Sequence, residues 1–276
     1  MNLQLLSDLH LEADPTFAAA PAPGADLLVL AGDVGSYQTR RDGSAMDEPD
    51  WGLQRFSPLP QYGGWPVPVL FVPGNHEYDN LDWDEAHAGL RRACDRLGIA
   101  WLERETLRID GVRFVGTTLW SDYDALAPIQ ATETERLRQR EKAFRAANFY
   151  LHKMAGQRHG ALFDAAAMRE LALECQDWLR AELSRSQAGP TVVVTHFAPT
   201  LHSADPRYGL TPGTAGFCNA LDDLLPHADL WLHGHLHCPT DLRVGRCRIV
   251  ANPLGYARKD EQAGFRPTLT VHVEIP

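Results

Sequence analysis

The feature that most constrains the fold is a series of short apolar runs, each followed at once or within three residues by Asp, Asn or His. Aliphatic runs of this length are typical of buried β-strands, and helical patterns separate several of them. Strands that alternate with helices predict an α/β fold. The runs occupy residues 3–6, 26–31, 67–72, 191–194 and 229–232.

Longer stretches between and after these runs show helical periodicity, at residues 81–98, 132–153 and 164–183. An Asp-Gly pair predicts a hairpin within residues 108–114, and further strands are expected at residues 248–251 and 268–273. Because hairpins interrupt the parallel pattern, we expect mixed rather than purely parallel β-sheet.

The length of 276 residues fits one large domain, and we expect a single domain over residues 1–276. Two stretches look like additions to the sheet. Residues 36–64 are rich in Pro, Gly and charge, which predicts a long loop with a short helix near residues 51–56. Residues 122–188 are expected to form a helical insertion.

The net charge of -10 argues against tight binding to long duplex nucleic acid, which requires clustered Lys and Arg. A small phosphorylated substrate remains compatible, because metal ions can reverse the local charge. The five cysteines are scattered and show no CxxC spacing, so neither a disulfide framework nor a thiolate zinc site is expected. No apolar run is long enough to cross a membrane, and we expect a cytoplasmic location. The sequence does not indicate an oligomeric state.

Polar side chains gather where the predicted strands end. In α/β sheets, functional sites form outside the carboxyl ends of the strands, so these side chains are expected to meet. A mixture of carboxylate, imidazole and amide groups suits Mn, Fe, Zn or Co better than Ca or Mg. There are more candidate ligands than one ion requires, which favours two ions that share a carboxylate. The candidates are Asp8, His10, Asp33, Asn75, His76, His196, His235 and His237.

Alternation along an extended chain predicts that Asp8 and His10 face the same ion, and likewise His235 and His237. A glycine at position 234 allows the backbone to approach the ions closely. His233 lies on the strand side of this glycine, and we expect it to point elsewhere.

Taken together, these motifs resemble the calcineurin-like metallophosphoesterase superfamily. The resemblance rests on Asp8-x-His10, Gly32-Asp33, Gly74-Asn75-His76-Glu77, His196 and Gly234-His235-x-His237, in that order, and runs from residue 5 to about residue 256. Three further segments, at residues 118–123, 195–200 and 252–256, are similar to those of bacterial members whose substrates are commonly unassigned.

The resemblance implies an α/β fold of four layers, in which two mixed β-sheets are flanked by helices and a dinuclear metal site lies at the C-terminal ends of the strands. It implies two transition-metal ions, divalent or trivalent, of Mn, Fe or Zn. Asp33 would bridge them. One ion would be held by Asp8, His10, Asp33 and His237, and the other by Asp33, Asn75, His196 and His235.

The implied activity is hydrolysis of a phosphoester by in-line attack of a metal-bridging hydroxide. Asn75 would help to neutralise the phosphoryl oxygens, and His76 would assist departure of the alcohol. Glu77, behind the metal ligands, or a backbone carbonyl would fix the tautomer of His76. A phosphodiester and a phosphomonoester both stay open. The diester is slightly favoured, because His10 completes the first ligand set as in members that handle diesters.

Four other residues are candidates for contact with the substrate: His202, Arg207, Tyr208 and Arg258. Two other functions also stay open. One is a protein that keeps the fold without catalysis and acts as a scaffold, although members of that kind typically lose His76 or metal ligands. The other is a mononuclear metal hydrolase of amide or ester bonds, which would leave Asp33 and Asn75 unexplained.

Overall fold

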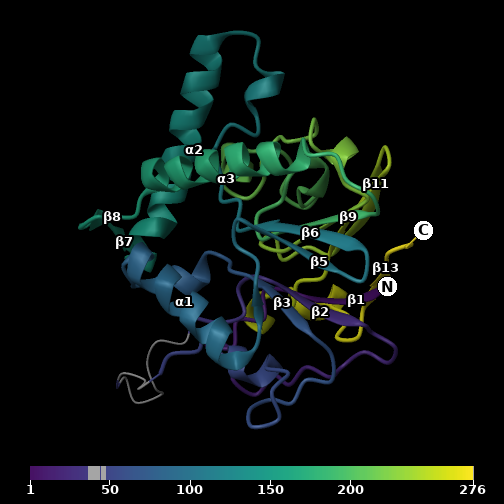
Figure 1. Ribbon diagram of the computed structural model, residues 1–276. Helices are drawn as coiled ribbons and strands as arrows, with labels where there is room; N and C mark the ends of the chain where they lie inside the picture. Colours follow the sequence, from purple (N-terminus) through teal and green to yellow (C-terminus); the bar gives the residue numbers. More distant parts are fainter. Residues whose placement is uncertain (37–43, 45–47, 276) are drawn as a thin grey trace.

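The computed structural model describes residues 1–36, 44 and 48–275, and part of the expected loop at residues 36–64 therefore lies outside the described residues. Two mixed β-sheets lie face to face with helices on their outer sides (Figure 1). This is the α/β architecture of two mixed sheets flanked by helices that the sequence predicts.

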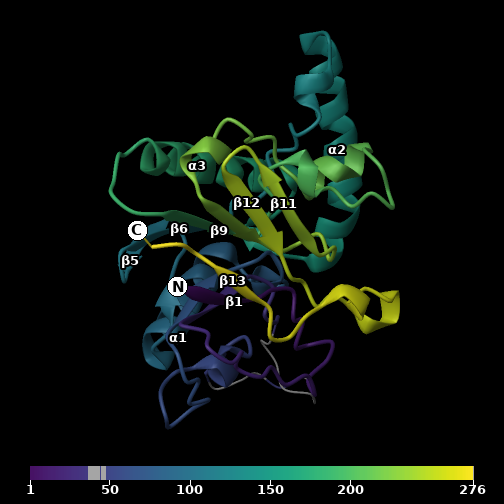
Figure 2. The same ribbon diagram turned by 90° about the vertical axis from the view of Figure 1, so that its right-hand side faces the viewer.

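The first sheet has the strand order β13-β1-β2-β3-β4. Its strands run parallel except for β13, which pairs antiparallel with β1 and brings the two ends of the chain together (Figure 2). The strands are β1 (Asn2–Leu6), β2 (Leu27–Ala31), β3 (Val69–Val72), β4 (Ala100–Trp101) and β13 (Thr270–His272). β3 starts later than expected, directly after Pro68, because proline lacks the N–H that a central strand must donate.

The second sheet has the order β11-β12-β10-β9-β6-β5. Its four central strands are parallel and its two edge strands are antiparallel. The expected Asp-Gly turn joins β5 to β6, where Asp110 and Gly111 both have positive φ. The strands are β5 (Glu105–Ile109), β6 (Val112–Thr117), β9 (Thr191–Thr195), β10 (Leu230–His233), β11 (Thr240–Val244) and β12 (Cys247–Ala251).

An apolar core contains side chains from the inner strands of both sheets. Leu5, Val29 and Leu70 come from the first sheet, while Phe114 and Val194 come from the second, and all are buried. Sheets packed in this way hold their strand ends in fixed relative positions, because cores are close-packed and resist small shifts.

Helix α1 (Trp83–Leu97) begins at the cap residue Asp82 and ends at Gly98, which has a φ of 67°. Helix α3 (Ala165–Leu183) begins at Asp164 and lies along the outer face of the second sheet, in contact with β6 (Figure 1). Helix α2 (Glu133–Met154) starts with a Thr132–Glu135 capping box.

The stretch expected as a helical insertion contains α2, the small hairpin β7 (Gln157–Arg158) and β8 (Ala161–Leu162), and α3. One end of α2 projects from the body (Figures 1 and 2). Its other end is fastened beside the β3 loop, because the carbonyl of Met154 accepts a hydrogen bond of 2.7 Å from the N–H of Asn80.

Short 3-10 helices occupy many of the loops. One of them, η1 (Leu53–Phe56), is the short helix expected near residues 51–56. The others are η2 (His76–Tyr78), η3 (Ala127–Ile129), η4 (Leu201–Ser203), η5 (Pro212–Gly216), η6 (Leu225–His227), η7 (Ala257–Lys259) and η8 (Gln262–Gly264). Among the described residues, no helix is long and apolar enough to span a bilayer.

Candidate metal centre

Two groups of potential metal ligands meet at the ends of β1, β2, β9 and β10, and they share Asp33. Within each group, one ligand atom from every residue lies within 4.8 Å of the others. The first group is Asp8, His10, Asp33 and His237, and the second is Asp33, His196 and His235. The cluster predicted from the strand ends is therefore assembled in the structure.

In the first group, the Nε2 atoms of His10 and His237 are 3.0 Å apart. His237 Nε2 lies 3.4 Å from Asp8 Oδ1, and His10 Nε2 lies 4.0 Å from Asp33 Oδ2. These atoms converge on one small volume, which is the arrangement that a cation needs.

In the second group, His196 Nε2 lies 3.2 Å from Asp33 Oδ2 and 3.2 Å from Asn75 Oδ1. The rings of His196 and His235 have centroids 5.0 Å apart. Asn75, which follows β3, thus adds an amide oxygen to the imidazole and carboxylate ligands. The same oxygen of Asp33 faces both groups, as a bridging carboxylate would.

The ligands are not presented by extended strands. Asp8, His10, Asp33, His235 and His237 all have positive φ, between 46° and 71°. Such values are uncommon outside glycine and cost free energy, and they tend to gather at functional sites. The alternation argument was therefore wrong as an explanation, because both pairs of ligands lie beyond their strands. Asp8 and His10 lie in the first group together, but His237 lies in the first group and His235 in the second, so the expectation of one shared ion is wrong for the second pair.

The surroundings of Gly234 confirm that the backbone passes close to the ligand carboxylates, as expected. A Cβ atom at this position would lie 2.6 Å from Asp8 Oδ2 and 2.9 Å from the carbonyl oxygen of Ala31. A Cβ at Gly74 would collide with Asp33 Oδ1 in the same way. Both glycines let neighbouring loops approach the carboxylates closely.

Two buried oxygens show that this donor set fits metal ions. Asp8 Oδ1 accepts the N–H of His235 at 2.9 Å, and Asp33 Oδ1 accepts the N–H of His76 at 2.9 Å. The second oxygen of each carboxylate is buried without a hydrogen-bond partner among the described residues. Unpaired buried carboxylate oxygens are costly, and a cation between these groups would satisfy both.

In three of the ligand histidines, His10, His196 and His237, Nδ1 is hydrogen-bonded on the side away from the ligand group, which turns Nε2 toward it. Nδ1 of His10 donates to Glu12 at 3.2 Å, and Nδ1 of His237 donates to Glu261 at 2.7 Å. Nδ1 of His196 donates to the carbonyl oxygen of Ala31 at 2.9 Å. Partners of this kind fix the tautomer and orientation of a metal-binding imidazole.

The sequence reasoning missed Glu12 and Glu261. Glu12 lies two residues after His10 and could have been noticed from that spacing. Glu261 is separated from His237 by 24 positions, and no sequence signal joins them.

His76 lies beside the two ligand groups, with its ring centroid 5.0 Å from that of His10. Its Nδ1 donates to Asp79 Oδ2 at 2.5 Å, so Asp79 fixes the tautomer rather than Glu77. Glu77 instead accepts the backbone N–H groups of Val34 and Gly74, each at 2.7 Å, and that of Asp33 at 3.1 Å. Glu77 thus joins the loop after β2 to the loop after β3, behind the metal ligands.

The charges of the site act strongly on one another. Burial alone would raise the pKa of Asp8, but its hydrogen bond to His237 and the charge of that residue bring the pKa to about 2. Burial disfavours charge on His196, yet Asp33 raises the pKa of its imidazole to about 9. Protons and metal ions therefore compete for the same nitrogens, and metal binding should release protons.

His233 does not join the cluster. Its Nε2 is 3.0 Å from the hydroxyl of Ser203 and its Nδ1 is 3.0 Å from the carbonyl oxygen of Gly234. The side chain is fully buried, which lowers its pKa to about 4. It points away from the cluster, as the sequence predicts, and is a core histidine.

The expected substrate residues lie on exposed loops. His202 is 60% exposed and lies 3.6 Å from Asp222, while Arg207 is engaged by Asp205 at 2.6 Å. Tyr208 is exposed, with the Arg207 guanidinium 5.5 Å from its ring. Arg258 lies 5.1 Å from the ring of Tyr256, which itself stacks on His10. Of these four, Arg258 is the one linked to a metal-ligand residue through a shared aromatic contact.

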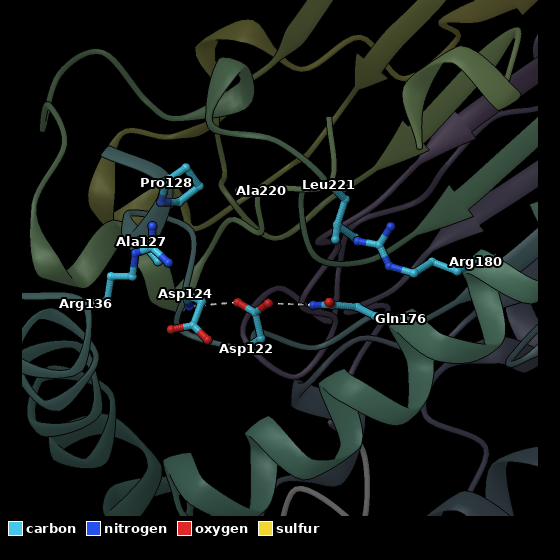
Figure 3. Close-up of a pocket in the computed structure, with 9 residues that line it drawn as sticks. All are labelled: Asp122, Asp124, Ala127, Pro128, Arg136, Gln176, Arg180, Ala220 and Leu221. Atoms are coloured by element: carbon cyan, nitrogen blue, oxygen red, sulfur yellow. Dashed lines mark hydrogen bonds between the residues drawn. The ribbon is translucent and has the colours of Figure 1, made fainter. Parts of the chain in front are cut away.

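A separate cavity of about 370 Å³ lies between α2 and α3 (Figure 3). Asp122 in its wall accepts hydrogen bonds from Gln176 at 2.9 Å and from the N–H of Asp124 at 2.8 Å. Its carboxylates are thus engaged by neighbouring groups, and the cavity shares no lining residue with the metal centre.

Comparisons with known proteins agree with this geometry. A family model described as calcineurin-like phosphoesterase matches residues 1–239. The uncharacterized protein L509 of Acanthamoeba polyphaga mimivirus is 25% identical over 220 residues, which cover 75% of this chain and 74% of that protein.

Two solved structures share the fold. A phosphopantetheinyl hydrolase from Mycobacterium tuberculosis superposes with a TM-score of 0.67 at 21% identity, over 98% of this chain and 95% of that chain. A dimetal phosphatase from Danio rerio superposes with a TM-score of 0.50 at 14% identity, over 91% of this chain and 86% of that chain.

Proposed function

Because the chain belongs to the calcineurin-like phosphoesterase family, we propose that it is a metal-dependent phosphoesterase that works with two transition-metal ions. The observation that carries this proposal is the position of Asp33 between two ligand groups, with one buried carboxylate oxygen left without a hydrogen bond. Asp8, His10 and His237 would complete one site. Asn75, His196 and His235 would complete the other.

Bound ions would supply positive charge for the phosphoryl oxygens and would lower the pKa of a water molecule toward neutrality. The protein contributes the geometry. Most of its ligands are loop residues with positive φ, and two packed sheets hold these loops in place. Little reorganisation is therefore needed when the substrate binds. The amide of Asn75 lies beside the second group, where it can also contact a phosphoryl oxygen.

His76 is proposed to act as the proton donor to the leaving alcohol. Asp79 holds its Nδ1, which leaves Nε2 free to hold a proton. Burial alone would lower the pKa of His76, but the charge of Asp33 and the contact with Asp79 raise it to about 10. These carboxylates favour the protonated imidazole that a general acid requires.

We favour a phosphodiester substrate over a monoester, since His10 completes the first ligand group. The similarity in fold to a phosphopantetheinyl hydrolase makes a phosphopantetheinyl ester a reasonable member of a substrate panel. A cytoplasmic location is part of the same proposal.

The test is hydrolysis of bis(p-nitrophenyl) phosphate beside p-nitrophenyl phosphate with added Mn²⁺. Release of nitrophenol that is abolished by a chelator would support the proposal, and the ratio of the two rates would identify the preferred ester. A protein that carries two metal ions but hydrolyses neither these esters nor the panel would contradict it. A chain that binds no metal would instead favour a scaffold, and one ion per chain would favour a mononuclear hydrolase.

A further inference from the structure

The segment after β12 is fastened to the metal centre, although it lies beyond residues 1–239 that the family model matches. The N–H of Leu254 donates to the carbonyl oxygen of Ser7 at 3.1 Å, and the N–H of Gly255 donates to that of Asp8 at 3.0 Å. Farther along, the carboxylate of Glu261 receives hydrogen bonds from His237 and from the N–H of Tyr256. Figure 2 shows the following η7 and η8 helices in yellow, beside the end of the second sheet.

These attachments place Tyr256 against the first ligand group. Its ring stacks on His10 with a centroid distance of 4.2 Å and an interplanar angle of 23°. It also meets the ring of His237 edge to face, at 5.3 Å. Tyr256 therefore contacts two of the four residues in that group.

Two positively charged side chains lie next to the same ring. The guanidinium carbon of Arg258 is 5.1 Å from the centroid of Tyr256, and Nζ of Lys259 is 4.9 Å from it. Arg258 is exposed and forms no ion pair with any described carboxylate. Lys259 lies 3.9 Å from Glu261, whose carboxylate is already engaged by His237. Both cations can thus accept an anion from solvent.

The surrounding charge gives these cations a role. Five carboxylates line the site or hold its histidines: Asp8, Glu12, Asp33, Asp79 and Glu261. Two divalent ions and the protonated His76 of the proposed mechanism would only balance these charges, so a second phosphate would find little positive charge without further cations. Arg258 and Lys259 lie against the ring of Tyr256, so one aromatic ring separates them from His10 in the first ligand group. Guanidinium and ammonium groups are the usual protein partners of phosphate.

We infer that Arg258 and Lys259, which lie against the ring of Tyr256, form a subsite for a second phosphate group of the substrate. The chain would then prefer a phosphoester that bears two phosphates over one that bears a single phosphate. This inference rests on the proposed function for the identity of the scissile bond, but binding tests it without turnover.

The experiment measures binding of thymidine 5'-phosphate, thymidine 5'-diphosphate and thymidine 3',5'-bisphosphate to Mn²⁺-loaded protein by calorimetry. A His76→Asn background slows consumption of the ligands. The test variant is Arg258→Gln/Lys259→Gln, whose exposed side chains can be changed without disturbing the core. The matched control is Arg92→Gln/Arg108→Gln, which removes the same charge from exposed positions on α1 and β5.

At least one of the two bisphosphorylated ligands should bind fivefold or more tightly than the monophosphate. The test variant should reduce this ratio below twofold, and the control should preserve it. Tyr256→Ala should also reduce the ratio, whereas Tyr256→Phe, which keeps the stacked ring, should not. An equal affinity for all three ligands, or a preference that survives in the test variant, would overturn the inference.

Hydrolysis separates this inference from the proposed function. Two substrates release the same p-nitrophenol: the 5'-p-nitrophenyl ester of thymidine 5'-phosphate, and the same ester with a 3'-phosphate. A binding preference without any turnover would argue against the phosphoesterase and leave the subsite in place. Turnover of both esters, with equal affinities in the binding experiment, would refute the subsite alone.

Discussion

Asp79 Oδ2 lies 2.5 Å from Nδ1 of His76, at the edge of the two ligand groups. The side chain of His76 is 20% exposed and that of Asp79 is 11% exposed, so solvent reaches the imidazole while its Nδ1 stays paired with Asp79. In the proposed mechanism the pair would supply what the metal ligands do not, namely a protonated group for a departing oxygen.

The His76–Asp79 pair gives the first prediction. His76→Asn should lower kcat for bis(p-nitrophenyl) phosphate by about 100-fold, because general-acid assistance is lost. Asp79→Asn should lower kcat about tenfold, since the imidazole loses the partner that favours its charged form. Metal content, measured by elemental analysis, should stay at the wild-type value in both. A kcat within twofold of wild type for His76→Asn would remove this residue from the proposed mechanism.

The second prediction concerns the carboxylates that hold the ligand histidines. Glu261→Gln should weaken Mn²⁺ binding about tenfold or more, because His237 loses a charged partner on Nδ1. Glu12→Gln should act in the same way through His10. Calorimetric titration of metal-free protein measures both. Glu170→Gln on α3, where the side chain is 73% exposed, is the control and should bind metal normally. Unchanged affinity in both test variants would count against the arrangement.

A third prediction concerns stability. The Glu77 side chain accepts three backbone N–H groups from two loops, and an amide at this position would direct its own N–H at one or two of them. Glu77→Gln should therefore reduce the free energy of unfolding by about 2–4 kcal/mol. Urea denaturation in the presence of a chelator measures this without a metal contribution. The exposed Glu85→Gln should change it by less than about 0.5 kcal/mol. A loss below that limit for Glu77→Gln would mean that the loops are held by other contacts.

The fourth prediction concerns pH and His87. The Nδ1 atom of His87 lies 3.1 Å from the hydroxyl of Tyr78, and its ring stacks on Trp83 with centroids 4.6 Å apart. Burial, with the charges of Arg104 and Arg91, lowers its pKa from 6.5 to about 4. The unfolded chain therefore binds the proton more readily than the folded protein, and stability is lost as pH falls from about 6.5 toward 4.

Between pH 7 and pH 5 this residue should cost the wild type about 1–2 kcal/mol. His87→Gln cannot titrate, so its free energy of unfolding should fall less over the same interval than that of the wild type. Denaturation at the two pH values gives the difference. Equal losses in both proteins would show that His87 does not need to be neutral in the folded state.

The sequence predicts the parts of this molecule that depend on local patterns. Strands β1, β2, β9 and β10 end within one residue of their expected positions, because aliphatic runs of that length have few other uses in a core. The caps Asp82 and Asp164 lie within the first residues of their expected helices. The ligand residues of the two groups are those that the motifs indicate.

The remaining features depend on contacts between distant segments. Glu261 reaches His237, and Tyr256 reaches His10, because the segment after β12 is hydrogen-bonded to Ser7 and Asp8 at the end of β1. Asp and His tolerate left-handed conformations better than most residues, but no local pattern indicates that Asp8 and His237 adopt them. Local patterns cannot report such relationships, since each is fixed only when the two sheets have packed together.

The central claim is that Asp33 joins two metal sites. The most direct test is the number of Mn²⁺ ions bound per chain, determined by elemental analysis after saturation of metal-free protein and removal of excess ion. The account requires two ions per chain in the wild type. A value of one ion, or of none, would contradict it.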